Sequence, residues 1–537
     1  MKLNKEWTGN KKEWEEAGFK LPQFDVESVA RNTYEHPVWV HMGAGNIFRA
    51  FPANVQQNIL NEGKSGTGII AVEGFDYEII DLMYRTHDNL GVLVTLKADG
   101  SIEKTLIGSV TEALALNPES GEEWERLTEI FTGKDLQMVS FTITEKGYNL
   151  LDGSGRLAAP VKQDFISGPE GARSYIGKVA ALLYKRYQAG QLPLAMVSMD
   201  NCSHNGDKLY NAVSAYAKAW KENGVCDRGF FDYINDPDKV SFPWSMIDKI
   251  TPRPDEKVKR MLMECGFEDV ETKVTSKNTY VATFVNAEEP QYLVIEDKFP
   301  NGRPNLEEGG IIFTDRETVD KVEKMKVCTC LNPLHTALAV YGCLLGYTLI
   351  ADEMKDEQLA RLVEVIGYEE GLPVVADPGI LSPKAFIDEV LKVRIPNPFM
   401  PDTPQRIATD TSQKLGIRFG ETIKAYRSRE GLKVEDLKLI PLVLAGWCRY
   451  LMGVDDEGKP MELSPDPLLD TVCPFVAGIK LGDQRDFHKE LKPVLSDGKI
   501  FGVDLYEAGL GELVEMYFAE MAAGPGAVRS TLIKYVR

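Results

Sequence analysis

The chain has 537 residues, too many for one hydrophobic core, so a single small domain is excluded and two or three domains are expected. With 43% hydrophobic and 26% charged residues, the composition is that of a globular protein and excludes a largely disordered chain. The formal net charge of -20 excludes a broad nucleic-acid-binding surface, so an anionic ligand would need local cations or main-chain donors.

The N-terminus and the cysteines indicate an intracellular protein. The first residues, MKLNKEWTGNKKEWEEAG, are polar and lack the apolar segment of a signal peptide. The eight cysteines are scattered through a long chain, which is typical of reduced thiols and not of a disulfide framework. We therefore expect a cytoplasmic protein, whose oligomeric state the sequence does not define.

The first predicted strand is followed directly by a glycine turn. Val38–Met42 is apolar, Gly43 and Gly45 come next, and residues 46–60 have the apolar spacing of a helix, with Pro52 near its first turn. Strand, glycine turn and helix in this order are the setting of a dinucleotide-binding fingerprint. We expect Gly43 and Gly45 to bind a dinucleotide; the alternative is an ordinary turn.

The start of this predicted helix carries polar side chains that suit a pyrophosphate. Asn46 and Arg49 follow the glycines closely, where main-chain N–H groups and the helix dipole favour an anion. Phe48 occupies the place of the third fingerprint glycine, and Ala50 is a substitute for its close-packing role. For Arg49 the alternative interpretation is a solvated helix residue.

A second apolar strand, Gly68–Val72, ends at Glu73. A carboxylate at the end of the second strand can accept hydrogen bonds from both ribose hydroxyls, which favours NAD over NADP. Glu73 lies further from the glycines than the usual spacing of about 20 residues, and Asp76 is the alternative acceptor.

Strands alternate with helices as far as residue 223, and this alternation predicts a doubly wound α/β sheet. Glu145–Tyr148 and Asp200–Gly206 are polar segments directly after buried strands, where open α/β sheets bind ligands. Strands are expected at 92–96 and 103–110, joined by a hairpin at 98–100, and at 137–144, 194–199 and 291–297; helices are expected at 169–188 and 207–223.

Helical patterns dominate after about residue 315, and the loop Pro300–Pro304 precedes this change. We therefore expect a Rossmann-type domain over residues 1–310 and a mainly helical domain over residues 311–537. The second domain is expected to have helices at 316–350, 353–368, 384–393, 416–427, 434–452, 484–492 and 509–522.

One segment of this helical region could be taken for a membrane span. Residues 333–351 contain no Lys, Arg, Asp or Glu, and Gly342 and Gly346 form a GxxxG pattern. A buried helix inside a large helical domain is the interpretation we favour, because the small glycine face then allows another segment to approach closely.

Lys326, Asn332 and His335 stand at the start of this apolar segment, and such edges of buried segments are places where ionisable groups are tuned for chemistry. Taken singly, each has an ordinary alternative: a solvated lysine, a helix cap and a structural histidine. Cys328 and Cys330 with His335 would suggest zinc, but the spacing is not that of common zinc sites, so we expect no metal.

The chain resembles the polyol-specific long-chain dehydrogenases, a family that includes mannitol dehydrogenases, fructuronate reductases and tagaturonate reductases. The resemblance extends over nearly the whole chain. It is carried by residues 43–50, Thr142–Glu145, Asp200–Asn201, Phe242–Pro252, Val294–Asp297, Lys326–His335 and Arg406–Lys414. It implies a metal-independent enzyme with a Rossmann-type domain followed by a helical domain, NAD as the cofactor, and no nucleic acid or membrane as a partner.

The resemblance also implies roles for single residues. It assigns the catalytic lysine to Lys326, with Asn332, His335 and Asn201 as its partners, and the substrate contacts to Arg406 and Lys414. Thr144 and Asp248 lie in matched segments and are expected at the cofactor site. These residue types suit ketone reduction, in which a lysine supplies a proton and asparagines stabilise the charge that develops on oxygen.

One spacing departs from the family pattern. In the family, the catalytic asparagine lies five positions after the catalytic lysine, whereas Asn332 lies six positions after Lys326. Lys324 is the other candidate for the catalytic lysine. A π-bulge can absorb one extra residue in a helix, and Pro333, which removes a main-chain donor, independently predicts a break beside Asn332.

The reaction implied by the resemblance is an NAD-linked reduction of a keto sugar acid, with D-fructuronate and D-mannonate as the expected pair. Tagaturonate reduction and mannitol-type polyol oxidation are the close alternatives. A uronate epimerase with a bound NAD and a catalytically silent dinucleotide sensor are the more distant ones.

Overall fold

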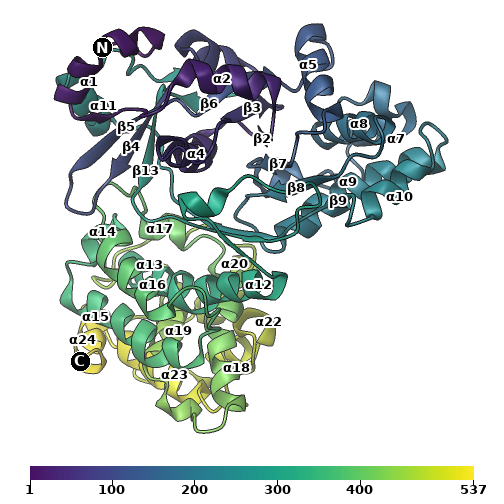
Figure 1. The fold of residues 1–537 in the computed structure, drawn as a ribbon. Coiled ribbons are helices and arrows are strands. Elements are labelled where there is room, and N and C mark those ends of the chain that lie inside the picture. The colour runs from purple at the N-terminus through teal and green to yellow at the C-terminus, as the bar shows by residue number, and fades with distance from the viewer. The chain divides into compact units, whose positions relative to one another are not determined.

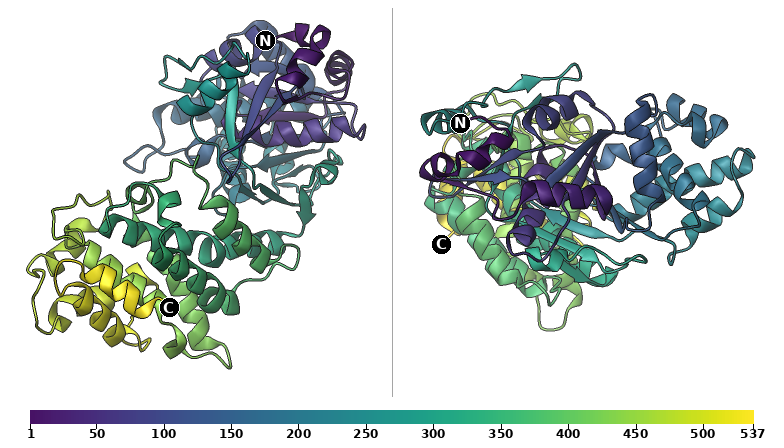
Figure 2. Two further views of the ribbon diagram at one scale, coloured as in Figure 1. Left: turned by 90° about the vertical axis from the view of Figure 1, so that its left-hand side faces the viewer. Right: turned by 45° about the horizontal axis from the view of Figure 1, so that its top comes forward.

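The computed structural model describes residues 1–537, which form two compact units. The first unit comprises Met1–Lys97 and Ser101–Asp320, and the second comprises Lys321–Arg537 together with Ala98–Gly100. Strands occur in the first unit, whereas the second is built of helices and connecting segments (Figures 1 and 2). The expected order of an α/β region followed by a helical region is therefore confirmed.

The centre of the first unit is a six-stranded, wholly parallel sheet with the order β6-β3-β2-β7-β8-β9. Numbered by their place along the chain, these strands follow the order 3-2-1-4-5-6 of a Rossmann fold. The order reverses between β2 and β7, which makes the crevice at their carboxyl ends the expected ligand site. The strands are β2 (Trp39–Met42), β3 (Ile69–Glu73), β6 (Val110–Ala115), β7 (Met138–Phe141), β8 (Leu194–Ser198) and β9 (Val240–Ser241).

Two hydrophobic clusters cover the two faces of this sheet. Successive residues of β2 divide between them: Val40 and Met42 belong to one cluster and Trp39 to the other, as the two-residue period of a strand requires. Helices α5 (Gly121–Thr132), α8 (Tyr175–Gln188) and α9 (Asn205–Glu222) pack on the first face, and α4 (Pro52–Asn61) packs on the second. The sheet is therefore doubly wound, as predicted.

The helix predicted at 46–60 is divided. α3 (Asn46–Ala50) is capped by Phe51, and α4 begins at Pro52. Proline is well tolerated at the first position of a helix. The strand predicted at 103–110 is also divided: β5 (Ile102–Ile107) pairs with β4 (Gly91–Leu96) in a separate four-stranded sheet, and β6 enters the Rossmann sheet. Gly108 lies at the change of sheet, where a Cβ would crowd a methyl group of Val26.

Three further strand groups complete the first unit. β1 (Phe19–Lys20) and β13 (Phe284–Glu288) flank β5 and β4 in the four-stranded sheet. β10 (Ser245–Asp248), β14 (Tyr292–Glu296) and β15 (Ile312–Thr314) form a three-stranded sheet, and β11 (Lys273–Val274) pairs with β12 (Tyr280–Val281) in a short ribbon.

A long helical segment provides the core of the second unit. It runs through the part of α12 (Arg316–Met325) that follows Asp320, a π-helical turn at Lys326–Cys330 and α13 (Asn332–Leu344), and α13 packs against α19 (Leu439–Tyr450). It ends at Leu344, earlier than predicted, because Gly346 adopts a positive φ of 78° and the Tyr347 N–H turns back to the Gly342 carbonyl at 2.8 Å.

This segment, Arg316–Leu344, is the one helix long and apolar enough to cross a membrane. However, 78% of its most apolar stretch is buried by the rest of the protein. Every residue of α13 from Thr336 to Leu344 is buried. This burial favours the predicted core helix over a membrane span.

Candidate active site

The glycine turn after β2 has the conformation that a dinucleotide cradle requires. Gly43 has a φ of 103°, and a Cβ at this position would lie 2.3 Å from the carbonyl oxygen of Thr142, so only glycine fits. In contrast, a Cβ on Gly45 would meet no atom within 4 Å. The turn is thus tightly packed beneath Gly43 and open in front of Gly45, which leaves room for a phosphate group to approach the main chain.

Glu73 ties the glycine turn to the loop that follows β3. Its Oε2 accepts a hydrogen bond from the Ala44 N–H at 3.0 Å, and its Oε1 accepts from the N–H groups of Phe75 (2.8 Å) and Asp76 (3.1 Å). The side chain is buried. Asp76, the alternative acceptor, is instead hydrogen-bonded to Thr275 at 2.6 Å. Glu73 is therefore both the carboxylate at the expected ribose position and a support for the glycine turn.

Arg49 has a different environment from the one predicted. It is buried, and its Nη1 and Nη2 donate to the carbonyls of Ala282 (2.8 Å) and Thr283 (2.6 Å). Burial lowers the pKa of this guanidinium. These contacts hold α3 against the chain that enters β13, so we assign Arg49 a structural role and omit it from the pyrophosphate contacts. Asn46 begins α3 and is partly exposed.

Phe48 and His41 form a stacked pair beneath the glycine turn, with ring centroids 4.3 Å apart. The two His41 ring nitrogens lie 2.7 Å from Ser140 Oγ and 2.8 Å from Thr142 Oγ1. Burial lowers the pKa of His41 to about 3, so the ring is neutral at physiological pH. Sequence reasoning did not single out His41, although a histidine inside an apolar strand just before a glycine turn was a usable signal.

Asp200 organises the loop that carries Thr144. It accepts hydrogen bonds from the N–H groups of Ile143 (3.0 Å) and Thr144 (2.8 Å) and from the Tyr148 hydroxyl (2.5 Å). Burial has the largest effect on the pKa of the Asp200 carboxyl group and raises it. Thr144 has a positive φ of 64°, and β7 ends at Phe141, so the strand predicted at 137–144 extends three residues too far at its C-terminal end. This loop lies at the carboxyl end of β7, where a Rossmann ligand binds.

Asn201 and Asp248 lie in different settings. Asn201 directly follows Asp200 at the carboxyl end of β8 and is exposed. Asp248 is buried at the end of β10, where it pairs with Tyr292 of β14 in the three-stranded sheet and not in the Rossmann sheet. The catalytic role of Asn201 and the cofactor role of Asp248 stay predictions.

In the second unit, the predicted catalytic lysine opens the π-helical turn. The Leu331 N–H donates to the Lys326 carbonyl at 3.1 Å, and α13 begins at the next residue, Asn332. Lys326 is 4% exposed, whereas Asn332 and His335 are half-buried and Lys324 is exposed. The helix therefore contains the bulge predicted from the spacing, and the buried lysine at its start is Lys326.

Arg406 and Lys414 belong to the segment that packs beside α13. α17 (Pro404–Ile407) contacts α13, and the Arg406 side chain is exposed and paired with Asp402. Lys414 is partly buried and donates to the Thr409 carbonyl; burial and then the charge of Arg418 lower its pKa. The second unit thus contains a buried lysine, an asparagine, a histidine and basic residues that could bind an anionic sugar.

No group of metal-binding side chains gathers around the π-turn. Nowhere in residues 1–537 do three or more His, Cys, Asp or Glu side chains gather as metal ligands. Burial raises the pKa of the Cys330 thiol to about 12, which opposes the thiolate that zinc requires.

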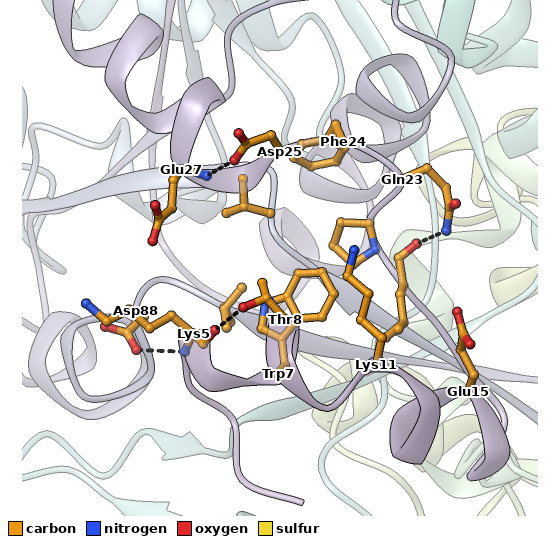
Figure 3. A pocket seen from close by; sticks show the side chains of 14 residues that line it. Lys5, Trp7, Thr8, Lys11, Glu15, Gln23, Phe24, Asp25, Glu27 and Asp88 are labelled. Carbon is orange, nitrogen blue, oxygen red and sulfur yellow. Dashed lines mark hydrogen bonds between the residues drawn. The ribbon is translucent and has the colours of Figure 1, made fainter.

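A cavity of about 560 Å³ lies elsewhere, in the N-terminal part of the first unit. Its lining comes from side chains between residues 5 and 15, from residues 21–27, and from Asp88 and Leu90 (Figure 3). None of the predicted site residues lines it.

Comparison with known proteins identifies both parts of the chain. The Mannitol dehydrogenase Rossmann domain matches residues 38–308, and the Mannitol dehydrogenase C-terminal domain matches residues 318–521. The chain belongs to the mannitol dehydrogenase family. The D-mannonate oxidoreductase of Thermotoga maritima is 55% identical over 538 aligned residues, which cover 100% of this chain and 99% of the relative.

Two solved dehydrogenase structures are also similar to this chain over nearly its whole length. Mannitol 2-dehydrogenase of Pseudomonas fluorescens, solved as a ternary complex with NAD and D-mannitol, is 26% identical, with a TM-score of 0.68 and 99% coverage of both chains. A substrate-free D-sorbitol dehydrogenase is also 26% identical, with a TM-score of 0.77 and coverage of 95% of this chain and 98% of its own.

This mannitol dehydrogenase family protein is an oxidoreductase whose cofactor is NAD. The glycine turn fits that cofactor, because the space in front of Gly45 is open and the carboxylate of Glu73 lies at the end of β3. Gly43, Gly45, Asn46, Glu73 and Thr144 are the residues that we expect to hold it.

Proposed function

We propose that this protein is an NAD-dependent D-mannonate oxidoreductase that interconverts D-fructuronate and D-mannonate. The observation that carries the proposal is the 55% identity to the Thermotoga maritima D-mannonate oxidoreductase over the full length of both chains. Identity at this level, across both the cofactor domain and the helical domain, favours a shared substrate over a shared fold alone.

In the proposed reaction, bound NADH supplies a hydride to the keto carbon of the sugar acid. Lys326 supplies the proton that the carbonyl oxygen acquires, and in the reverse direction it removes the hydroxyl proton. Asn332 and Asn201 donate hydrogen bonds to the charge that develops on this oxygen. His335, three residues after Asn332 on the same helix, orients a substrate hydroxyl or the lysine.

Arg406 and Lys414 are proposed to bind the substrate carboxylate. Arg406 is exposed and therefore accessible, although it must exchange its contact with Asp402 for the substrate. The pKa of Lys414 is lowered by burial and by Arg418, and a bound carboxylate would oppose both effects. The carboxylate of a sugar acid can therefore pair with these two basic side chains, whereas a neutral polyol has no carboxylate to do so.

NADH consumption measured with D-fructuronate, D-tagaturonate and D-fructose tests the proposal. The proposal requires the highest kcat/KM on fructuronate. Preference for tagaturonate would make the protein a tagaturonate reductase, and activity on fructose alone would refute the sugar-acid assignment. Isomerised product without net NADH consumption would indicate an epimerase.

We also propose a cytoplasmic location, which the lack of any disulfide among the eight cysteines supports.

A further inference from the structure

The β11–β12 ribbon reaches the loop that follows β3, although the two are about 200 residues apart in the sequence. The ribbon pairs Lys273 with Val281 and Val274 with Tyr280, and its turn is closed by the Thr275 carbonyl and the Asn278 N–H at 2.9 Å. The tip of the ribbon, residues 275–277, contacts the loop that follows β3.

Three consecutive tip residues bind three positions of the β3 loop. The Thr275 hydroxyl donates to Asp76 Oδ2 at 2.6 Å, and both groups are buried. The Ser276 N–H donates to Glu78 Oε1 at 3.2 Å. The Lys277 ammonium donates to the Phe75 carbonyl. The ribbon therefore holds the main chain of this loop from one side.

Phe75 is exposed in spite of these contacts. Its side chain is 64% accessible, the highest value among the large hydrophobic residues of the protein. The Lys277 ammonium lies 4.2 Å from the centroid of the Phe75 ring, a cation–π distance. A single exposed aromatic ring is common on protein surfaces, but this one is held in place by its neighbours and offers an open face on which another flat group can stack.

The position of Phe75 defines what that group is. Phe75 follows the carboxylate of Glu73 by two residues at the carboxyl end of β3, and its N–H donates to Glu73 Oε1 at 2.8 Å. In a Rossmann fold the carboxylate at this strand end meets the adenosine ribose. The adenine base attached to that ribose must therefore lie beside the segment that contains Phe75.

We propose that Phe75 and Lys277 form the adenine subsite of the NAD site, with the purine stacked on the open face of the Phe75 ring. The ribbon keeps Phe75 in place through Thr275 and Lys277, and the lysine covers the ring on its other side. This inference rests on the assignment of NAD as the cofactor, and it does not depend on which sugar is the substrate.

The charges around the loop support an adenosine nucleotide. Lys178 donates to the Tyr77 hydroxyl at 2.8 Å and to the Gly74 carbonyl at 3.3 Å. Burial, followed by the nearby positive charge of Lys277, lowers the pKa of Lys178 to about 8. Two lysines therefore lie close to the end of β3 in a protein with a net charge of -20, where they offset the repulsion of a nucleotide phosphate.

Calorimetric binding of NADH, ADP-ribose and reduced nicotinamide mononucleotide tests the proposal without any sugar substrate. Phe75→Ala is expected to weaken NADH and ADP-ribose binding by about tenfold, because stacking on one base contributes on the order of tenfold or more in affinity. Binding of the mononucleotide, which lacks adenine, is expected to be unchanged. Phe75→Trp retains an aromatic face and should bind NADH as the wild type does.

Two further variants complete the test. Lys277→Met should weaken NADH and ADP-ribose binding less than Phe75→Ala, with the mononucleotide again unaffected. Val274→Ala, at an exposed position of the same ribbon outside its tip, is the matched control and should bind all three ligands normally. Unchanged NADH affinity of Phe75→Ala, or an equal loss for the mononucleotide, would overturn the adenine subsite. A wild-type protein that prefers another sugar would refute only the proposed function.

Discussion

The main-chain N–H of Leu331 donates to the carbonyl of Lys326 at 3.1 Å, a hydrogen bond that spans five residues instead of four. This π-turn takes up one extra residue, and an α-helix turns by roughly 100° per residue. Lys326 and Asn332, six apart in the sequence, are therefore related as residues five apart in a regular α-helix. The departure from the mannitol dehydrogenase family spacing is thus compensated by the local structure.

This geometry distinguishes the two candidate lysines. Lys326→Ala is expected to lower kcat by about 10²- to 10⁴-fold, the usual contribution of a general acid or base. Lys324→Ala is the matched control, because Lys324 is exposed on the same helix while Lys326 is buried. Steady-state kinetics with D-fructuronate and NADH, together with NADH binding, measure both effects. An equal loss of kcat in the two variants would contradict the assignment of Lys326.

The two glycines of the cofactor turn are expected to respond differently to alanine. Gly43→Ala introduces a Cβ at a positive φ and 2.3 Å from the Thr142 carbonyl oxygen, so it should destabilise the fold by about 1 kcal/mol or more. Gly45→Ala has room for its Cβ in the protein without cofactor, so the melting temperature should not change. Its methyl group would occupy the space in front of the turn and lower NADH affinity at least about tenfold.

Thermal unfolding and NADH titration of both variants separate these effects. A Gly45→Ala protein with normal NADH affinity would show that the pyrophosphate does not approach this part of the turn. A Gly43→Ala protein with normal stability would show that the turn tolerates a Cβ despite the contact.

The parts of the structure that depend on neighbouring residues were predictable. The strand, glycine turn and helix at residues 38–60 follow local patterns, and a bulge next to Asn332 follows from a spacing and the adjacent Pro333. The break at Pro52 also had a local cause, although the sequence pattern suggested one helix. These features need only the few residues on either side.

The remaining differences arise from contacts between distant parts of the chain. Arg49 was predicted to face a pyrophosphate, but its guanidinium is held by carbonyls more than 230 residues further along the sequence. The strand predicted at 103–110 changes sheet at Gly108, because the alternating pattern does not specify the partner of a strand. The hydrogen bonds that join Glu73 to the glycine turn and the ribbon that reaches Phe75 likewise depend on the tertiary fold.

Arg406 is expected to discriminate sugar acids from neutral sugars. Arg406→Ala should raise the KM for D-fructuronate by about tenfold or more, because it removes a charge-assisted contact with the carboxylate. Any residual activity with D-fructose should be unaffected, since this ketose has no carboxylate. Thr403→Ala alters the cap of the same helix, α17, without removing the charge and is the control for local disruption. Equal effects on both substrates would contradict a carboxylate contact.

Glu353 is expected to make the stability of the second unit depend on pH. Both of its carboxyl oxygens are buried without a hydrogen-bond partner, and the group lies against Gly342, where a Cβ would be 2.1 Å from Oε1. Burial, and then the charge of Asp356, raise the pKa of Glu353 to about 9. The small GxxxG residue Gly342 thus makes room for a neutral carboxyl group.

The sign of the pH effect follows from the two protonation states. In the folded protein Glu353 stays protonated up to about pH 9, whereas in the unfolded chain it ionises near its ordinary value of 4.5. Between these values the unfolded state releases a proton that the folded state retains, so wild-type stability falls as pH rises, by at most about 1.4 kcal/mol per pH unit. Glu353→Gln removes the ionisation, so its stability relative to the wild type should be raised only slightly at pH 5 and increasingly more at pH 6.5 and pH 8. Urea unfolding at these three pH values measures the difference, and Glu357→Gln, the same change at an exposed position, should show no such trend. A difference between Glu353→Gln and the wild type that does not vary with pH would show that Glu353 is ionised in the folded protein.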